Sequence, residues 1–319
     1  MAQIDRALRS NLKLRHLQLV VALDEFRHLG RTAEFLSVSQ PAISKMLSEV
    51  EEMLEMQLFD RSRRGTEPTI AGRSIVRFAR SVLAEFERTK EEIEGLEKGL
   101  SGRTKVGFMV VAMPTLLAPA IAHLKKESNA ATVLLEEGDL TQLLPKLRIG
   151  ELDLFVGRLE PGYASPDLQT EALYSEKMRI VVAKGHALAK RKNMTWNDLR
   201  QIRFVTPPPW ASMRVKLEQQ FFKHGLQPPS DIVETASFLG QITFVCEQES
   251  AALMAQSVAQ HFSDRGFVDI LNIEVPVDVP PVGLITMRDR KLTPITQRLS
   301  EIMRIHTASK KKTGIHPKL

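Results

Sequence analysis

Residues 31–52 read RTAEFLSVSQPAISKMLSEVEE and organise the N-terminal part of the chain. Ser39 is placed to cap a helix, and Pro41 falls in its first turn, where a missing backbone N–H costs nothing. A shorter helix is expected over residues 32–36. The apolar residues of the second helix recur at the spacing of one helix face, and they are Ile43, Met46, Leu47, Val50 and Leu54. The pattern therefore predicts two helices joined by a tight turn.

The opposite face of the second helix is polar and lacks a carboxylate before Glu49. Gln40 and Ser44 can read base edges in a major groove, and Lys45 can meet guanine or phosphate. The helix N-terminus also favours phosphate oxygens. An amphipathic helix with a polar face is, by itself, far more often a solvated surface helix than a DNA-binding one. The residues that follow favour DNA.

Residues 58–69, LFDRSRRGTEPT, form a short hairpin-like segment around Gly65. Three cations lie close to this glycine: Arg61, Arg63 and Arg64. A basic tip of this kind can straddle a phosphate backbone. The segment is therefore predicted to be the wing of a winged helix-turn-helix.

The chain closely resembles the LysR-type transcriptional regulators in four successive segments. They are SQPAISK, LFDR, a basic turn with glycine, and TIAG at 69–72. The resemblance extends along nearly the whole chain. It implies an α/β protein with a helix-rich winged helix-turn-helix domain (1–70), a dimerisation helix (71–100) and a two-lobed, periplasmic-binding-protein-like effector domain (101–319). The residues expected to contact double-stranded DNA are Arg31, Ser39, Gln40, Pro41, Ser44, Lys45, Arg61, Arg63 and Arg64. Gly30, Thr32 and Pro68 depart from the family pattern, and Gly30 lacks a hydroxyl for a phosphate contact.

The composition is that of an ordinary globular protein. The 319 residues are 43% hydrophobic and 26% charged. The net charge is +6 and the sequence pI about 9.4. The excess positive charge lies in residues 101–319, partly in a lysine-rich tail that we expect to be solvated. No run is apolar enough for a membrane span or a secretory signal, so a cytoplasmic protein without a membrane partner is expected. The single cysteine, Cys246, excludes an internal disulfide.

A long helix is expected after Thr69. Its apolar residues recur at alternating threes and fours, with charged residues around them. The stripe comprises Ile75, Ala79, Val82, Phe86, Ile93 and Leu96. It predicts a homodimer through residues 72–98, and the alternative is a helix packed on its own domain. The family resemblance adds a homotetramer formed through the effector domains.

Beyond GLSG at 99–102, predicted strands alternate with predicted helices, which indicates parallel sheets with crossovers. A region of this size favours two subdomains. The family resemblance implies lobe I at about 103–162 and 275–306, and lobe II at about 166–272. It also implies crossings between the lobes at 161–166 and 272–276, and the Pro and Gly content of PGYASP supports the first.

Ligands of such sheets bind beyond the carboxyl ends of strands. This rule selects the effector-binding residues Val111, Met113, Thr115, Arg158, Thr206, Ser212, Ser237 and Phe238. Arg158 can hold a carboxylate bidentately, and its alternative role is an ordinary ion pair. Trp210 is either a pocket wall or a lid on the core. The GRL at 157–159 is similar to family members that regulate aromatic-acid breakdown and sugar uptake, so a small organic acid is the expected inducer.

The main alternative is an α/β enzyme with an accessory DNA-binding or dimerisation domain. The sequence has no phosphate loop, GxSxG or HExxH motif, and its eight histidines lack metal-ligand spacing. Two SxxK matches lie near the ends of the chain without companion motifs. We therefore expect no enzyme activity, cofactor or metal. A nucleoid-compacting protein would leave the C-terminal half without a purpose.

Overall fold

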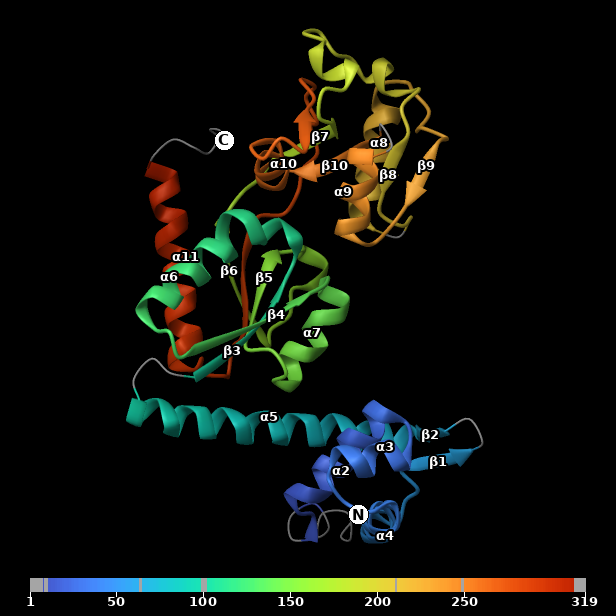
Figure 1. The fold of residues 1–319 in the computed structure, drawn as a ribbon, viewed down its shortest axis with the longest axis vertical. Coiled ribbons are helices and arrows are strands. Elements are labelled where there is room, and N and C mark those ends of the chain that lie inside the picture. Colours follow the sequence, from blue (N-terminus) through green and yellow to red (C-terminus); the bar gives the residue numbers. More distant parts are fainter. Residues whose placement is uncertain are drawn as a thin grey trace.

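The computed structural model describes residues 8, 11–62, 65–98, 102–209, 211–247 and 250–312. Figure 1 shows a helical N-terminal domain, a long helix crossing above it, and two α/β lobes stacked beyond that helix. Arg63, Arg64 and Trp210 lie outside the described residues, as do most of the predicted GLSG linker and the end of the lysine-rich tail.

The N-terminal domain consists of α2 (Leu14–Phe26), α3 (Leu29–Phe35), α4 (Gln40–Leu54) and a hairpin of β1 (Phe59–Ser62) and β2 (Gly65–Pro68). The predicted apolar face of α4 is confirmed, because four of its five residues are buried and Met46 packs against them. Helix α3 begins three residues before the predicted start. The cause is His28, whose side chain accepts hydrogen bonds from the backbone of Gly30 and Arg31.

Helix α5 (Ile70–Lys98) starts where Thr69 was expected to cap it, and the Thr69 hydroxyl accepts a hydrogen bond from Gly72 N at 3.0 Å. Its predicted stripe divides into two halves. Ala79 is buried in the N-terminal core, and Ile75 and Val82 pack against that core. Phe86 and Ile93 are 49% and 58% exposed. The first half of the helix therefore packs on its own domain, whereas the second half leaves apolar surface uncovered.

Lobe I contains a five-stranded sheet in the order β4-β3-β5-β12-β6. Its strands are β3 (Gly102–Phe108), β4 (Ala131–Glu137), β5 (Leu154–Arg158), β6 (Leu168–Tyr174) and β12 (Val282–Met287). Its helices are α6 (Ala118–Glu127), α7 (Leu140–Ile149) and α11 (Pro294–Lys312). Strands β3, β4 and β5 are parallel, but β12 pairs antiparallel with both β5 and β6.

Lobe II contains a second five-stranded sheet in the order β11-β7-β10-β8-β9. Its strands are β7 (Met178–Ala183), β8 (Phe204–Thr206), β9 (Ile232–Glu234), β10 (Ala251–Ala255) and β11 (Val268–Ile270). Its helices are α8 (Ser212–Lys223), α9 (Phe238–Glu247) and α10 (Gln256–Ser263). Strand β7 is antiparallel to β10 and β11. The predicted parallel pairing is present in both sheets, and the antiparallel strands β12 and β7 make both sheets mixed.

The boundary between the lobes also needs correction. Strand β6 pairs with β12 in lobe I, so the chain enters lobe II after Tyr174 and not at 161–166. Residues Pro161–Tyr163 form only a short 3₁₀ turn. The expected second crossing, 272–276, falls within the connection from β11 to β12. Buried residues of both lobes form one continuous apolar cluster, which is separate from the N-terminal core.

Candidate DNA-binding face and effector cleft

The start of α4 has the predicted geometry. The Ser39 hydroxyl accepts a hydrogen bond from Ala42 N at 3.4 Å, and Pro41 occupies the first turn. Gln40 and Lys45 are exposed on the outer side of the helix, and Ser44 is half-buried. The buried apolar face fixes the orientation of α4, so its polar face points outward.

The hairpin lies beside this polar face. Arg61 on β1 donates a hydrogen bond from Nη1 to the Ser44 hydroxyl at 3.0 Å. Ser48, one turn further along α4, donates to Ser44 O at 3.1 Å. The helix and the hairpin therefore form one continuous polar surface. Sequence analysis placed Ser44 and Arg61 in separate motifs and did not predict their contact.

Glu51 on the last half of α4 fixes the hairpin relative to the helix. Its Oε1 accepts hydrogen bonds from Leu58 N at 2.7 Å and Phe59 N at 3.1 Å. On the other strand, Thr66 N donates to Arg27 O at 2.9 Å. Glu51 was not predicted, because nothing in the sequence distinguishes it from the neighbouring glutamates.

On α3, Arg31 is exposed, and the backbone N–H groups of Gly30 and Arg31 donate to His28 Nδ1 at 3.1 and 3.3 Å. A Cβ at position 30 would lie 3.1 Å from His28 Cε1. The departure from the family pattern at Gly30 therefore accompanies an imidazole that caps this helix.

The loop after β3 lies on the lobe I side of the predicted cleft. It contains a 3₁₀ turn (Val110–Ala112) and a π turn (Met113–Leu117). The carbonyl of buried Val111 accepts hydrogen bonds from Tyr174 Oη at 3.5 Å and from Ser257 Oγ at 3.4 Å. The Thr115 hydroxyl lies 3.4 Å from Tyr174 Oη. Because Ser257 belongs to α10, this carbonyl joins the two lobes.

Tyr174 and Ser257 were missed by sequence analysis, since β6 and α10 were themselves missed. Burial raises the pKa of the Tyr174 phenol, so it is neutral at physiological pH and can donate its hydrogen bond.

Arg158 lies at the carboxyl end of β5, as predicted, but it is only 4% exposed. Its guanidinium donates to Pro280 O at 3.1 Å and to Met178 Sδ at 3.3 Å. Burial lowers the pKa of Arg158, an effect that Glu176 and Glu160 oppose. The hydrogen bonds of this guanidinium therefore go to a carbonyl and a thioether, while Glu176 and Glu160 act on it electrostatically.

Lobe II contributes a second buried cation. Arg214 on α8 donates to the buried Thr206 hydroxyl and forms ion pairs with Glu218 and, at 3.5 Å, with Glu234. Sequence analysis selected Thr206 but not Arg214, which ends the same loop. The Thr206 hydroxyl is therefore already an acceptor for a neighbouring arginine.

The remaining predicted residues of lobe II lie at helix starts. Ser212 is exposed at the first residue of α8. The Ser237 hydroxyl accepts a hydrogen bond from Gly240 N at 3.1 Å, so it caps α9. The half-buried Phe238 ring lies 5.6 Å from the ring of Phe262. No contact between these three residues and the predicted lobe I residues is seen in the described part of the chain.

A polar hollow of about 740 Å³ lies elsewhere on lobe II, lined by residues that include Arg191, Asp198, Arg203 and Asp231. Arg203 and Asp231 stand at the amino ends of β8 and β9, opposite the edge that carries Thr206. Arg191 pairs with Asp198 and Arg203 with Asp231. These ion pairs satisfy the charges, so we do not place the effector there.

In the described ranges, no group of three or more His, Cys, Asp or Glu side chains is arranged to hold a metal ion. Likewise, none of the helices described has the length and apolar character needed to cross a membrane.

Comparison with known proteins gives two family matches. Residues 14–73 match the bacterial regulatory helix-turn-helix protein, lysR family, and residues 97–308 match the LysR substrate binding domain. The chain is 33% identical over 288 residues to the HTH-type transcriptional regulator GbpR of Azospirillum brasilense, covering 90% of this chain and 84% of that protein. It is 27% identical to the HTH-type transcriptional regulator PcaQ of Agrobacterium fabrum, covering 87% and 89%.

The fold is similar to that of the crystal structure of CbnR, a LysR family transcriptional regulator. The TM-score is 0.71 at 21% identity, covering 93% of this chain and 99% of that one. The two family matches together include the helix-turn-helix, the wing and both lobes. The chain therefore belongs to the LysR family of transcriptional regulators.

Proposed function

We propose that the chain binds double-stranded DNA sequence-specifically and that a small organic acid, bound between the lobes, modulates this binding. The single observation that carries the proposal for DNA is the continuous polar surface of α4 and the hairpin, joined by Arg61 and Ser44. Gln40 and Lys45 are exposed on it. Residues of these types read base edges, whereas hairpin arginines neutralise phosphates.

In this proposal the DNA-binding residues have two roles. Gln40, Ser44 and Lys45 contact base edges in the major groove. The residues that contact or orient the phosphate backbone are Arg31, Ser39, Pro41, Arg61, Arg63 and Arg64. Ser39 and Pro41 act at the amino end of α4, where backbone N–H groups attract phosphate oxygens.

The proposal of an acidic inducer rests on Arg158. Burying a cation that donates to a carbonyl and a thioether is costly, and an anionic ligand would offset that cost. Val111, Met113 and Phe238 would contact the apolar part of the ligand, and Thr115, Thr206, Ser212 and Ser237 its polar groups. Arg214 adds a second cation beside Thr206.

Dimerisation through the second half of α5 is part of the same proposal. The exposed Phe86 and Ile93 side chains need a partner surface, and a second copy of α5 supplies one with matching period. Two chains then present two recognition helices to two half-sites. Association of dimers through effector domains, as the family resemblance implies, gives the tetramer.

The experiment for DNA is binding-site selection with purified variants. Gln40→Ala and Lys45→Ala should relax preference at particular base pairs, at a cost of about 1 to 3 kcal/mol each. Arg63→Ala with Arg64→Ala should weaken binding to every sequence and reduce the salt dependence. Identical selected sequences and salt slopes for both groups would refute the assignment.

The experiment for the inducer is calorimetric titration with aromatic and sugar acids. We expect one of them to bind the wild-type chain, and Arg158→Ala to abolish that binding while inducer-free DNA affinity is kept. Arg203→Ala is the matched control, because it removes a paired arginine from the same domain, outside the cleft. Unchanged affinity in Arg158→Ala would show that this arginine has a structural role only.

A further inference from the structure

Arg80, near the middle of α5, contacts three parts of the molecule. Its Nη2 lies 3.1 Å from Asp24 Oδ2 and 3.5 Å from Glu25 Oε2, both on α2. Its Nη1 lies 2.5 Å from Oε1 of Glu151, which follows α7 in lobe I. Burial lowers the pKa of Arg80, but the hydrogen bonds that its guanidinium donates to Glu151 and Asp24 outweigh this effect and raise the pKa. One guanidinium therefore joins the DNA-binding domain, the linker helix and the effector domain.

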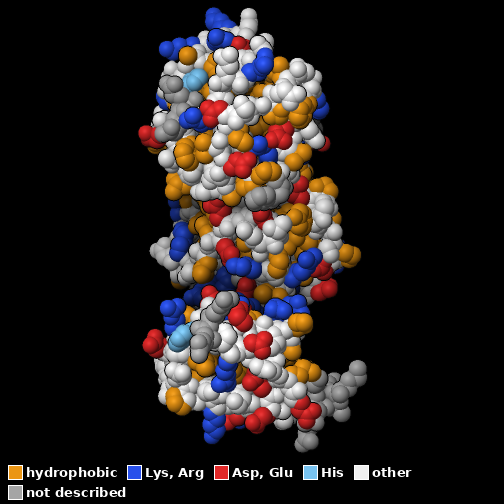
Figure 2. Space-filling view, turned by 90° about the vertical axis from the view of Figure 1, so that its right-hand side faces the viewer, with side chains coloured by type: hydrophobic (Ala, Val, Ile, Leu, Met, Phe, Trp, Pro, Cys, Tyr) orange, Lys and Arg blue, Asp and Glu red, His pale blue; other side chains and the backbone are white. Residues whose placement is uncertain are grey.

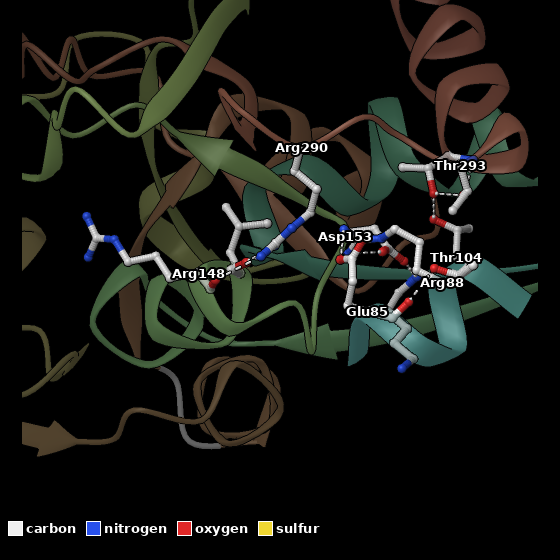
Figure 3. A network of polar contacts seen from close by, with 11 residues as sticks. Glu85, Arg88, Thr104, Arg148, Asp153, Arg290 and Thr293 are labelled. Atoms are coloured by element: carbon white, nitrogen blue, oxygen red, sulfur yellow. Dashed lines mark hydrogen bonds and ion pairs between the residues drawn. The ribbon is translucent and has the colours of Figure 1, made fainter. Parts of the chain in front are cut away.

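Arg88 lies two turns further along α5 and is only 6% exposed, although its neighbour Phe86 is 49% exposed. Its Nη2 lies 3.4 Å from Asp153 Oδ1, and its Nη1 lies 3.3 Å from Glu85 Oε2. Asp153 in turn accepts a hydrogen bond from Lys105 N at 2.8 Å. Figure 3 shows Arg88 pointing from α5 toward Asp153 in lobe I. Lobe I therefore covers this arginine.

The backbone of lobe I comes close to α5 between these two arginines. Gly150 ends α7 with a φ of +83°, and a Cβ placed there would lie 3.1 Å from Cβ of Ala84. Arg290 binds the last carbonyls of α7, Leu147 O at 2.7 Å and Arg148 O at 3.0 Å. The end of α7 is thus shaped to meet the helix, and Figure 2 shows basic and acidic side chains gathered at this junction.

This contact lies on the same strands as the cleft. Asp153 immediately precedes β5, and Arg158 is the last residue of β5. Lys105 is on β3, and Val111 follows the end of β3. Five residues of strand span about 16 Å. A packed sheet therefore connects the cleft edge of lobe I to the edge that contacts α5.

We propose that Arg80 and Arg88 with Glu151 and Asp153 form a docking contact that holds lobe I on the linker helix of the same chain. The contact fixes the orientation of the effector domain relative to the DNA-binding domain. Arg80 and Glu151 are partly exposed, so their pair is weak enough to open and close. A ligand in the cleft that displaces lobe I must break the contact, a consequence that rests on the function proposed above.

Intrachain distances measured by pulsed electron spin resonance test the docking contact. Spin labels are placed at Gln18→Cys on α2 and Gln142→Cys on α7, both exposed, in a Cys246→Ser background. Labelled chains are diluted with an excess of unlabelled chains, so that only distances within one chain contribute. Neither DNA nor inducer is present, so the result does not depend on the proposed function.

We expect one narrow distance distribution for the otherwise wild-type chain. Glu151→Lys keeps the Arg80–Asp24 pair but should reduce the ratio of docked to undocked chains roughly fivefold. Arg88→Ala should have the larger effect, because it removes the more deeply buried pair. Glu171→Lys is the matched control, since it breaks the ion pair with Arg304 within lobe I, away from α5.

Ionic strength provides a second measurement on the same samples. At about 1 M salt the Debye length is only about 3 Å, so the wild-type distribution should broaden toward that of Glu151→Lys. The Arg88→Ala distribution should be broad at low and high salt. Should Glu151→Lys and Arg88→Ala keep the narrow wild-type distribution while remaining folded by circular dichroism, the docking contact does not determine domain orientation and the proposal fails.

Discussion

The DNA-binding face and the effector cleft are built in different ways. Residues 39–45 supply most of the DNA-binding face from consecutive positions on one helix, and a single neighbour, Arg61, completes it. The proposed cleft instead takes its residues from five separate elements, namely Val111, Arg158, Tyr174, Arg214 and Ser257. A local face depends on the packing of one helix, whereas an assembled cleft depends on two sheets and their connections.

The largest expected loss of stability tests whether the N-terminal domain and the lobes have independent apolar cores. Leu47 on α4 is fully buried in an apolar cluster that is distinct from that of the lobes. Leu47→Ala should destabilise the DNA-binding domain by about 2 to 5 kcal/mol, through lost burial and the cavity left behind. Differential scanning calorimetry should show this loss in one transition only.

Leu124→Ala is the matched control, because Leu124 is equally buried on α6 of lobe I. It should lower the midpoint of the effector-domain transition and leave DNA binding of the folded protein unchanged. If either substitution shifts both transitions equally, the two cores unfold as one unit and the comparison between the regions breaks down.

The second effect is a test of the assembled cleft. Arg214→Met removes a buried cation that donates to Thr206 and pairs with Glu218 and Glu234. Because hydrogen bonds to charged groups are lost, we expect lobe II to lose about 1.5 to 3 kcal/mol. Arg203→Met, which breaks a surface pair with Asp231, should cost less than Arg214→Met. Equal losses in urea unfolding would remove the distinction between the two arginines.

The difference between the regions also explains what could be predicted from sequence. The face of α4, its Ser39 cap and the hairpin were predicted because each depends on residues close in sequence. The strand β6 was missed, since its centre, Gln169 to Glu171, is polar and carries no apolar alternation. Residues 161–166 were assigned to a crossing from the family resemblance and from their Pro and Gly content, which marks only a short turn before β6.

Periodicity does not predict contacts between residues that are distant in sequence. Tyr174, Ser257 and the partners of Arg80 become visible only when the sheets are assembled. Arg214 is the exception, because a cation in the loop after β8 could have been selected by the rule that selected Thr206. The rule of position at a strand end therefore selects Arg214 as well as Thr206.

A smaller loss of stability tests whether the DNA-binding face is a local structure. Ser39→Ala removes the side-chain acceptor for Ala42 N and should destabilise the DNA-binding domain by about 1 kcal/mol. Ser39→Asp restores an acceptor and should recover most of that stability. Chemical denaturation monitored by helix content measures both. A loss in Ser39→Asp as large as that in Ser39→Ala would mean that the hydroxyl acts elsewhere than at the cap.

The smallest effect concerns pH. His16 is buried in the first turn of α2, and its Nδ1 accepts a hydrogen bond from Lys13 N at 3.2 Å. Burial lowers the pKa of His16 below its usual 6.5, Arg15 and Lys13 lower it further, and Glu49 opposes them. The folded domain thus favours the neutral imidazole. The resulting stability is present above pH 6.5 and is lost as the pH falls through the lowered pKa.

Calorimetry between pH 7.5 and pH 5 should therefore show a decline in the DNA-binding transition that His16→Gln reduces. The effector domain contains His261, whose pKa is also lowered by burial and by Arg265. Because that ring is partly exposed, the effector transition should decline less over the same range. His261→Gln is the control, and it should leave the DNA-binding transition unchanged. If His16→Gln retains the full decline, the pH sensitivity of the N-terminal domain arises from other groups, and His16 does not distinguish the two regions.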